Sequence, residues 1–104
     1  MQHLISQIGH TATAELVEMW QKEAPKRLEC IERAFHSGNH DKVRQEAHAL
    51  RGACSVFGLS EATEACRNIE ETVKNGKPAE LPQLLELTQA LQNAAAFLRA
   101  SVHG

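Results

Sequence analysis

The chain has 104 residues, of which 42% are hydrophobic, a length and composition that suit one domain, residues 1–104, with a single core. Its net charge of −2 mixes both signs, which argues against a nucleic-acid partner, and no apolar run reaches the roughly 18 residues of a membrane-spanning helix. The N-terminus lacks the basic and then apolar layout of a signal peptide, and three cysteines without CxxC spacing are expected to be reduced thiols in a cytoplasmic protein.

The composition favours helices, because Ala, Leu, Glu, Gln, Lys and Arg dominate. Residues 2–9 predict a short helix that lays an apolar side on a larger body, with Gly9 as its end. Thr11 or Thr13 is expected to cap the next helix, since a side-chain oxygen at that position satisfies free backbone N–H groups.

The second predicted helix covers residues 12–36, where apolar residues recur at the helical period. Pro25 interrupts the backbone hydrogen bonds there, but the apolar stripe stays in step on both sides of it. We therefore predict one kinked helix, which Gly38 ends in a left-handed conformation. Its stripe consists of Leu16, Trp20, Ala24, Leu28, Ile31 and Phe35.

The third predicted helix covers residues 40–57, with Asn39 as its N-cap. Its apolar residues are spaced by four, three, four and three positions, which predicts one buried seam. Gly58 is expected to stop this helix, followed by the apolar Leu59. The seam consists of Val43, Ala47, Leu50, Cys54 and Phe57.

Two further helices complete the chain. The fourth is predicted over residues 61–75, with Ser60 as its cap and an apolar stripe of Ala62, Cys66, Ile69 and Val73. The last is predicted over residues 79–102, where Pro82 is tolerated only in the first turn. Its seam, with the spacing of left-handed helix packing, consists of Leu84, Leu87, Leu91, Ala94 and Leu98, with Leu81 and Val102 extending it.

Long amphipathic helices joined by a few residues each must run antiparallel to their neighbours in the sequence. We therefore predict an all-α fold, an antiparallel up-down-up-down four-helix bundle with a short extra N-terminal helix. A long two-helix coiled coil is the alternative, which the short connections and the chain length disfavour.

A helical wheel divides the third helix into two faces. With Val43 at zero and about 100° per residue, the seam lies within roughly 40° of zero. His48 falls at about 140°, away from the core, and is expected to face water. Four residues share its side of the helix, at about 80° to 180°: Arg44, Arg51, Ser55 and Gly52.

Each residue on this face has a chemical use. An exposed imidazole is partly neutral and nucleophilic at cytosolic pH, and a guanidinium can pair with a phosphoryl group. Gly52 costs helix stability, but it removes a side chain that would cover the His48 ring, so a bulky partner could approach. A single surface histidine is more often an ordinary solvated side chain, and His36 with His40 is disfavoured as a zinc pair because a turn separates them.

The stretch AHALRGACSVFGL, residues 47–59, resembles the signature of histidine-containing phosphotransfer (HPt) domains. That signature reads A-H-x-L-[KR]-G, with small residues after it and a glycine six positions later. The upstream stretch EAPKRLECIERAF and the turn at Gly38 also resemble these domains. The sequence departs from the family in Arg51, where lysine is commoner, and in Cys54 and Val56, where small or polar residues are frequent.

The resemblance implies the same four-helix bundle and phosphorylation of His48 on a ring nitrogen, usually Nε2. It also implies partners, namely receiver domains of response regulators in a phosphorelay, including the receiver of a hybrid sensor histidine kinase to which such a domain can belong. Arg51 and Gly52 are then expected to serve the phosphoryl group and its approach, with Arg44 and Ser55 as weaker candidates. No ATP loop or acidic magnesium site is present in the sequence, so magnesium is expected on the receiver and this chain is expected to be a monomeric carrier without a cofactor or kinase site.

Three other interpretations remain open at this stage. The dimerisation domain of a histidine kinase usually has an acidic residue after the histidine and a proline soon after, whereas Ala49 follows here and no proline occurs between positions 25 and 78. The phosphoacceptor domain of chemotaxis kinases has a similar motif, and its donor is a kinase domain that uses ATP. A helical adaptor without chemistry is the third interpretation.

Overall fold

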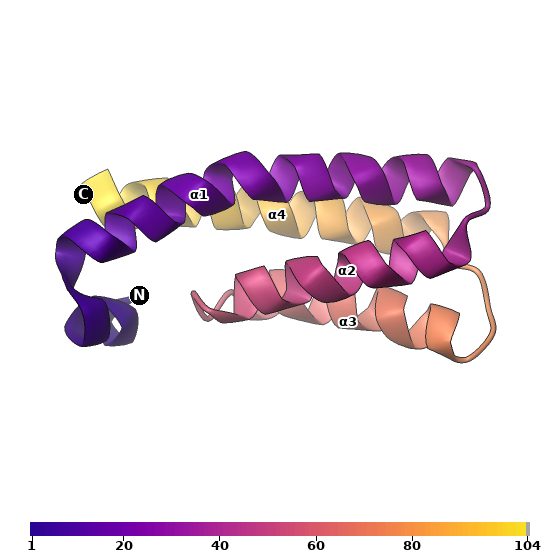
Figure 1. Cartoon of the computed structure of the whole chain (residues 1–104), viewed down its shortest axis with the longest axis horizontal. Coiled ribbons are helices and arrows are strands. Elements are labelled where there is room, and N and C mark those ends of the chain that lie inside the picture. Colours follow the sequence, from indigo (N-terminus) through magenta and orange to yellow (C-terminus); the bar gives the residue numbers. More distant parts are fainter. Residues whose placement is uncertain (104) are drawn as a thin grey trace.

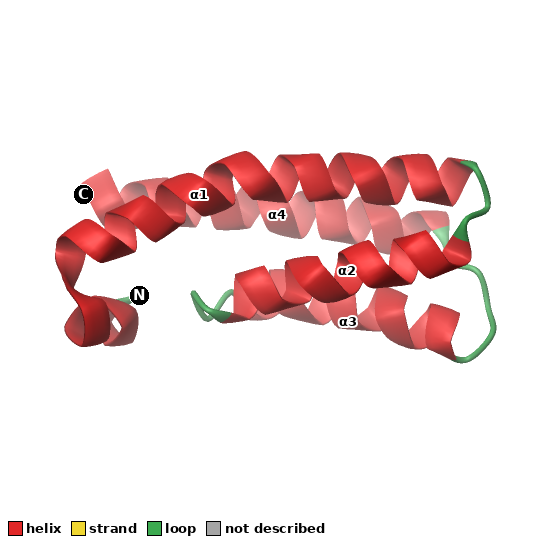
Figure 2. Ribbon diagram, viewed as in Figure 1, coloured by secondary structure: helices red, strands yellow, loops and turns green. Residues whose placement is uncertain are grey.

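A computed structural model describes residues 1–103 of the chain, without the His103 side chain; Gly104, the last residue of the predicted domain, lies outside the described residues. The described residues form four helices and no strands, which confirms the all-α prediction (Figure 2). None of these helices has the length and apolar content needed to cross a membrane. The helices are α1 (Gln2–His36), α2 (His40–Ser55), α3 (Ser60–Lys74) and α4 (Leu81–His103).

The four helices lie side by side along the longest axis of a molecule that measures 41 × 20 × 18 Å (Figure 1). The α1–α2 and α3–α4 connections lie at one end of the molecule, and the α2–α3 connection points toward the other end, where the two termini lie. Helix α1 packs against α2 and α4, and α3 packs against the same two helices, so the four form a ring around one core. The surface between α2 and α3 therefore lies on the opposite side of the ring from the surface between α1 and α4.

The N-terminal residues belong to α1, but Gly9 breaks its helical geometry with φ 86° and ψ 168°. The turns before Gly9 leave the axis of the rest of α1 (Figure 1). The predicted threonine cap is wrong, because Thr11 and Thr13 both lie inside the helix that follows Gly9. The Thr13 hydroxyl instead donates to the Gly9 carbonyl at 2.7 Å, since it stands one turn further along the chain.

The helix ends follow most of the predicted signals. Helix α1 continues through Pro25 as one helix and ends before Gly38, whose φ is 73°. Asn39 caps α2 as predicted, because its side chain accepts a hydrogen bond from the Lys42 N–H at 3.2 Å. Gly58, at φ 67°, lies just beyond the end of α2. The Ser60 cap is wrong, because Leu59 occupies the N-cap position and Ser60 is the first residue of α3.

The core is formed by apolar residues of all four helices, and the predicted seams of α2 and α4 supply many of them. The five seam residues predicted in 40–57 and the five central ones in 79–102 are all buried. Leu81 is an exception with 53% of its surface exposed, because it begins α4 on a different side of that helix. Cys54 and Cys66 are fully buried free thiols, and the hydrogen bond with Cys54, together with burial, raises the pKa of the Cys66 thiol.

Candidate functional site

The outer face of α2 carries the candidate nucleophile. His48 has 64% of its side chain exposed, which confirms the exposure that the helical wheel predicted. Helical side chains lean toward the N-terminus of their helix, so the His48 ring leans toward the turn that holds Arg44 and away from Gly52. Its Nε2 atom has no hydrogen-bond partner among the described residues. One ring nitrogen of an exposed histidine is therefore open to another molecule.

The other ring nitrogen of His48 contacts a residue that the sequence did not single out. Glu70, on α3, has an oxygen 2.7 Å from His48 Nδ1, and only 14% of its side chain is exposed. A carboxylate accepts hydrogen bonds and cannot donate them, so Nδ1 carries the hydrogen and donates it to Glu70. The lone pair of the neutral ring then resides on Nε2, the nitrogen that faces away from Glu70.

The length of the α2–α3 connection is the feature of the sequence that could have identified Glu70 as a neighbour of His48. The two helices run along each other and reverse at Leu59, so residues equally far from Leu59 on either side lie across from one another. His48 stands eleven residues before Leu59 and Glu70 stands eleven after it. A wheel drawn for a single helix cannot reveal such a pair.

Arg51 forms an ion pair with Glu70. Its Nε lies 2.5 Å from the second carboxylate oxygen of Glu70, and both of those atoms are buried. Its Nη2 lies 3.2 Å from His48 Nδ1, on the same side of the ring as Glu70. The guanidinium thus holds the Glu70 carboxylate in position beside the imidazole. In this structure Arg51 contacts the Nδ1 side of His48, whereas the sequence had placed it near an incoming phosphoryl group.

His48 opens onto a groove of about 510 Å³ between α2 and α3. Arg44 is half-buried in this groove and Lys74 is exposed; neither forms an ion pair among the described residues. With Arg51, three cations surround the histidine against two carboxylates, which favours an anionic ligand. The lining residues are Asp41, Arg44, His48, Arg51, Glu70, Val73 and Lys74.

Gly52 and Ser55 lie on the same side of α2, beyond His48. A Cβ added to Gly52 would meet no atom within 4 Å, so no neighbour in the fold demands a glycine there. The Ser55 hydroxyl donates to the Gly52 carbonyl at 2.9 Å and has no contact with His48. Of the five predicted site residues, the structure therefore brings Arg44, His48 and Arg51 together in the groove and leaves Gly52 and Ser55 beside it.

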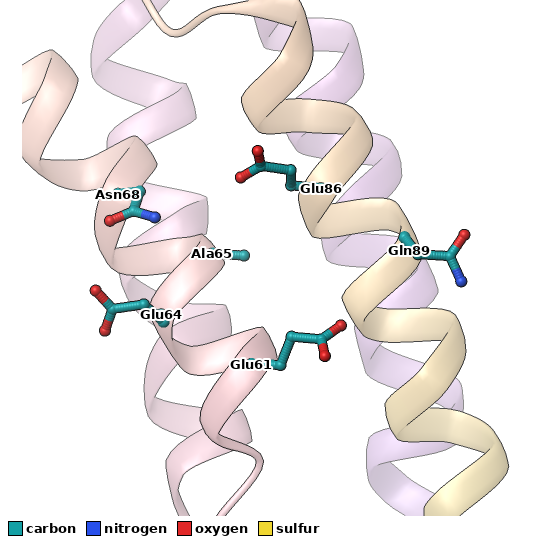
Figure 3. Close-up of a pocket in the computed structure, with 6 residues that line it drawn as sticks. All are labelled: Glu61, Glu64, Ala65, Asn68, Glu86 and Gln89. Carbon is teal, nitrogen blue, oxygen red and sulfur yellow. The ribbon is translucent and has the colours of Figure 1, made fainter.

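A second depression, between α3 and α4, has the opposite chemistry (Figure 3). It measures about 430 Å³ and contains three carboxylates and no histidine. Glu61 accepts a hydrogen bond from Asn93 at 3.1 Å, and Glu64 pairs with Arg67 at 2.7 Å. Its negative charge disfavours a phosphoryl group, and within residues 1–103 no three His, Cys, Asp or Glu side chains gather in a way that could hold a metal ion.

Comparison with protein-family models gives a match to the Hpt domain over residues 15–99. The matched region begins after the Gly9 kink and includes most of the four helices, with His48, Arg51 and Glu70 inside it. Comparison with curated proteins and with solved structures gave no significant match.

Proposed function

Because the chain belongs to the Hpt domain family, it acts in histidine phosphotransfer within phosphorelay signalling, and we propose that His48 is its phosphoacceptor. Hpt domains interact with receiver domains of response regulators. In the proposed reaction His48 accepts a phosphoryl group from the aspartate of one receiver and passes it to the aspartate of another. The observation that carries this proposal is the exposed imidazole whose Nδ1 donates to a half-buried carboxylate.

The proposed transfer step follows from that hydrogen bond. The lone pair of His48 Nε2 attacks phosphorus, an N–P bond forms, and the P–O bond of the acyl phosphate breaks with its electron pair leaving on the receiver carboxylate. The ring becomes positively charged because Nδ1 keeps its hydrogen. The Glu70 carboxylate, 2.7 Å from Nδ1, stabilises that charge as it develops, in the way that a buried aspartate supports a catalytic histidine.

Arg51 and Gly52 support this step in different ways. Arg51 keeps the Glu70 carboxylate oriented through the 2.5 Å contact of its Nε. Gly52 is exposed and leaves the C-terminal side of the ring uncovered, because a side chain at that position would lean toward His48. The proposed role of Arg44 is to contact the phosphoryl group, and that of Ser55 is to lie at the rim of the receiver contact.

The proposal includes the setting of the domain. Residues 1–104 form one monomeric domain with an antiparallel up-down-up-down bundle and a short N-terminal helix set off at Gly9. It is expected in the cytoplasm, where free cysteines stay reduced, and in contact with receivers that include one of a hybrid sensor histidine kinase. The receiver supplies the magnesium ion and the acidic residues that bind it, and this chain binds no cofactor of its own.

The test is phosphorylation of the chain by a phosphorylated receiver domain. We expect a label that is lost in acid and stable in alkali, and that disappears in His48→Gln. His40→Gln is the matched control, because His40 is an exposed histidine two turns earlier on α2 and should leave the label intact. A label that persisted in His48→Gln, or a wild-type chain that acquired none, would overturn the proposal.

A further inference from the structure

The second cation of the His48 groove, Lys74, lies on α3 and has no part in the α2 motif. It stands one helical turn beyond Glu70, as Arg44 stands one turn before His48 on α2. Both are fifteen residues from Leu59, where the chain reverses, so they face each other across the groove. Because the His48 ring leans toward the turn of Arg44, it leans toward Lys74 as well.

The charges around His48 divide into two sets. Arg51 and Glu70 neutralise each other on the Nδ1 side, through the contact of 2.5 Å. Moving Arg51 to a phosphoryl group would break its ion pair with Glu70, whose side chain is only 14% exposed. Arg44 and Lys74 form no ion pair among the described residues, so their charges are available for an anionic ligand.

We infer that Lys74, with Arg44, contacts the phosphoryl group on His48 and stabilises the phosphorylated state. This inference rests on the proposed function of His48. A phosphoryl group on Nε2 carries nearly two negative charges, and an ammonium on a flexible four-carbon stem can follow it into the groove. Lys74 thereby supplies from α3 the positive charge that Arg51, held by Glu70, does not supply from α2.

The experiment measures the equilibrium ratio of phosphohistidine on this chain to phosphoaspartate on a receiver domain. Lys74→Ala should lower that ratio about fivefold, the upper range for one partly exposed charge pair. Lys74→Arg should restore it to within about twofold, because the charge returns. Lys77→Ala is the matched control, since Lys77 has the same charge, lies three residues further on in an exposed connection and does not line the groove.

Salt provides a readout that a merely structural role would not change. The difference between Lys74→Ala and the wild type should shrink as ionic strength rises, since ions screen an exposed charge pair. If Lys74→Ala matched Lys77→Ala at low salt while the wild type was still labelled on His48, the inference about Lys74 would be wrong and the phosphoacceptor would stand. If the label survived His48→Gln, the proposed function would fail, and the inference with it.

Discussion

Replacing Glu70 by glutamine tests the link between this half-buried carboxylate and the proposed nucleophile, His48. One oxygen of the carboxylate accepts a hydrogen bond from His48 Nδ1 at 2.7 Å, and the other forms an ion pair with Arg51 Nε at 2.5 Å. An amide has the same shape but a single accepting oxygen, so Glu70→Gln can satisfy only one of them. If that oxygen turns to Arg51, the amide NH₂ faces Nδ1, and the ring hydrogen moves to Nε2, where it blocks attack.

The expected cost follows from the strengths of the two kinds of hydrogen bond. A hydrogen bond to a charged group contributes about 1.5–3 kcal/mol and a neutral one about 0.5–1.5 kcal/mol. We take about 1.4 kcal/mol, close to the difference between the middles of these two ranges. This corresponds to transfer that is about tenfold slower.

The assay is a rapid-quench measurement of phosphohistidine formed from a phosphorylated receiver. Glu71→Gln is the control, since it removes the same charge from the next, exposed position of α3. Nitrogen NMR of the histidine ring gives an independent readout, in which the population with hydrogen on Nε2 should rise in Glu70→Gln alone. Wild-type transfer rates together with an unchanged ring tautomer would refute the role assigned to Glu70.

Two further predictions concern Gly52 and Glu46. Gly52→Ala should raise the free energy of unfolding by about 0.5–1 kcal/mol, because its Cβ meets no atom and alanine favours helix, whereas Gly52→Leu should keep the fold and slow transfer. Normal transfer by the leucine variant in the same quench assay would show that Gly52 does not serve the approach to His48. Burial raises the pKa of Glu46, but hydrogen bonds from Lys42 and Arg27 outweigh it and lower that pKa overall. The stability that Glu46 contributes is therefore present above its ordinary value of 4.5 and is lost as the pH falls through the lowered folded value. Urea unfolding should show Glu46→Gln to be less stable than the wild type at pH 7 and nearly equal at about pH 3, and a difference independent of pH would contradict this.

The features predicted correctly from the sequence are those encoded within one helix. Apolar spacing located the seams of α2 and α4, and Gly38 and Gly58 located two helix ends, because both signals depend on neighbours within a few residues. The exposure of His48 followed from the same period. The caps at Thr13 and Ser60 failed because a hydroxyl near a helix start can also bind a carbonyl one turn back or stand one position inside the helix.

The features missed were those that join two helices. Glu70 and Lys74 belong to the site only because α3 returns along α2, and their positions depend on how many residues the connection consumes. Arg51 was predicted to lie in the site, but its pairing with a residue nineteen positions later was not, so its expected direction was different. Composition and single-helix periodicity carry no information about such pairings.

The inner face of α2 is sealed completely: Val43, Ala47, Leu50 and Cys54 have no accessible surface. A helix packed in this way is already fixed against rotation about its axis and against sliding before a receiver domain binds. An encounter then needs to immobilise only the incoming domain, which reduces the entropy lost on association. The proposed acceptor nitrogen, His48 Nε2, consequently presents one geometry to every receiver that carries an activated aspartate.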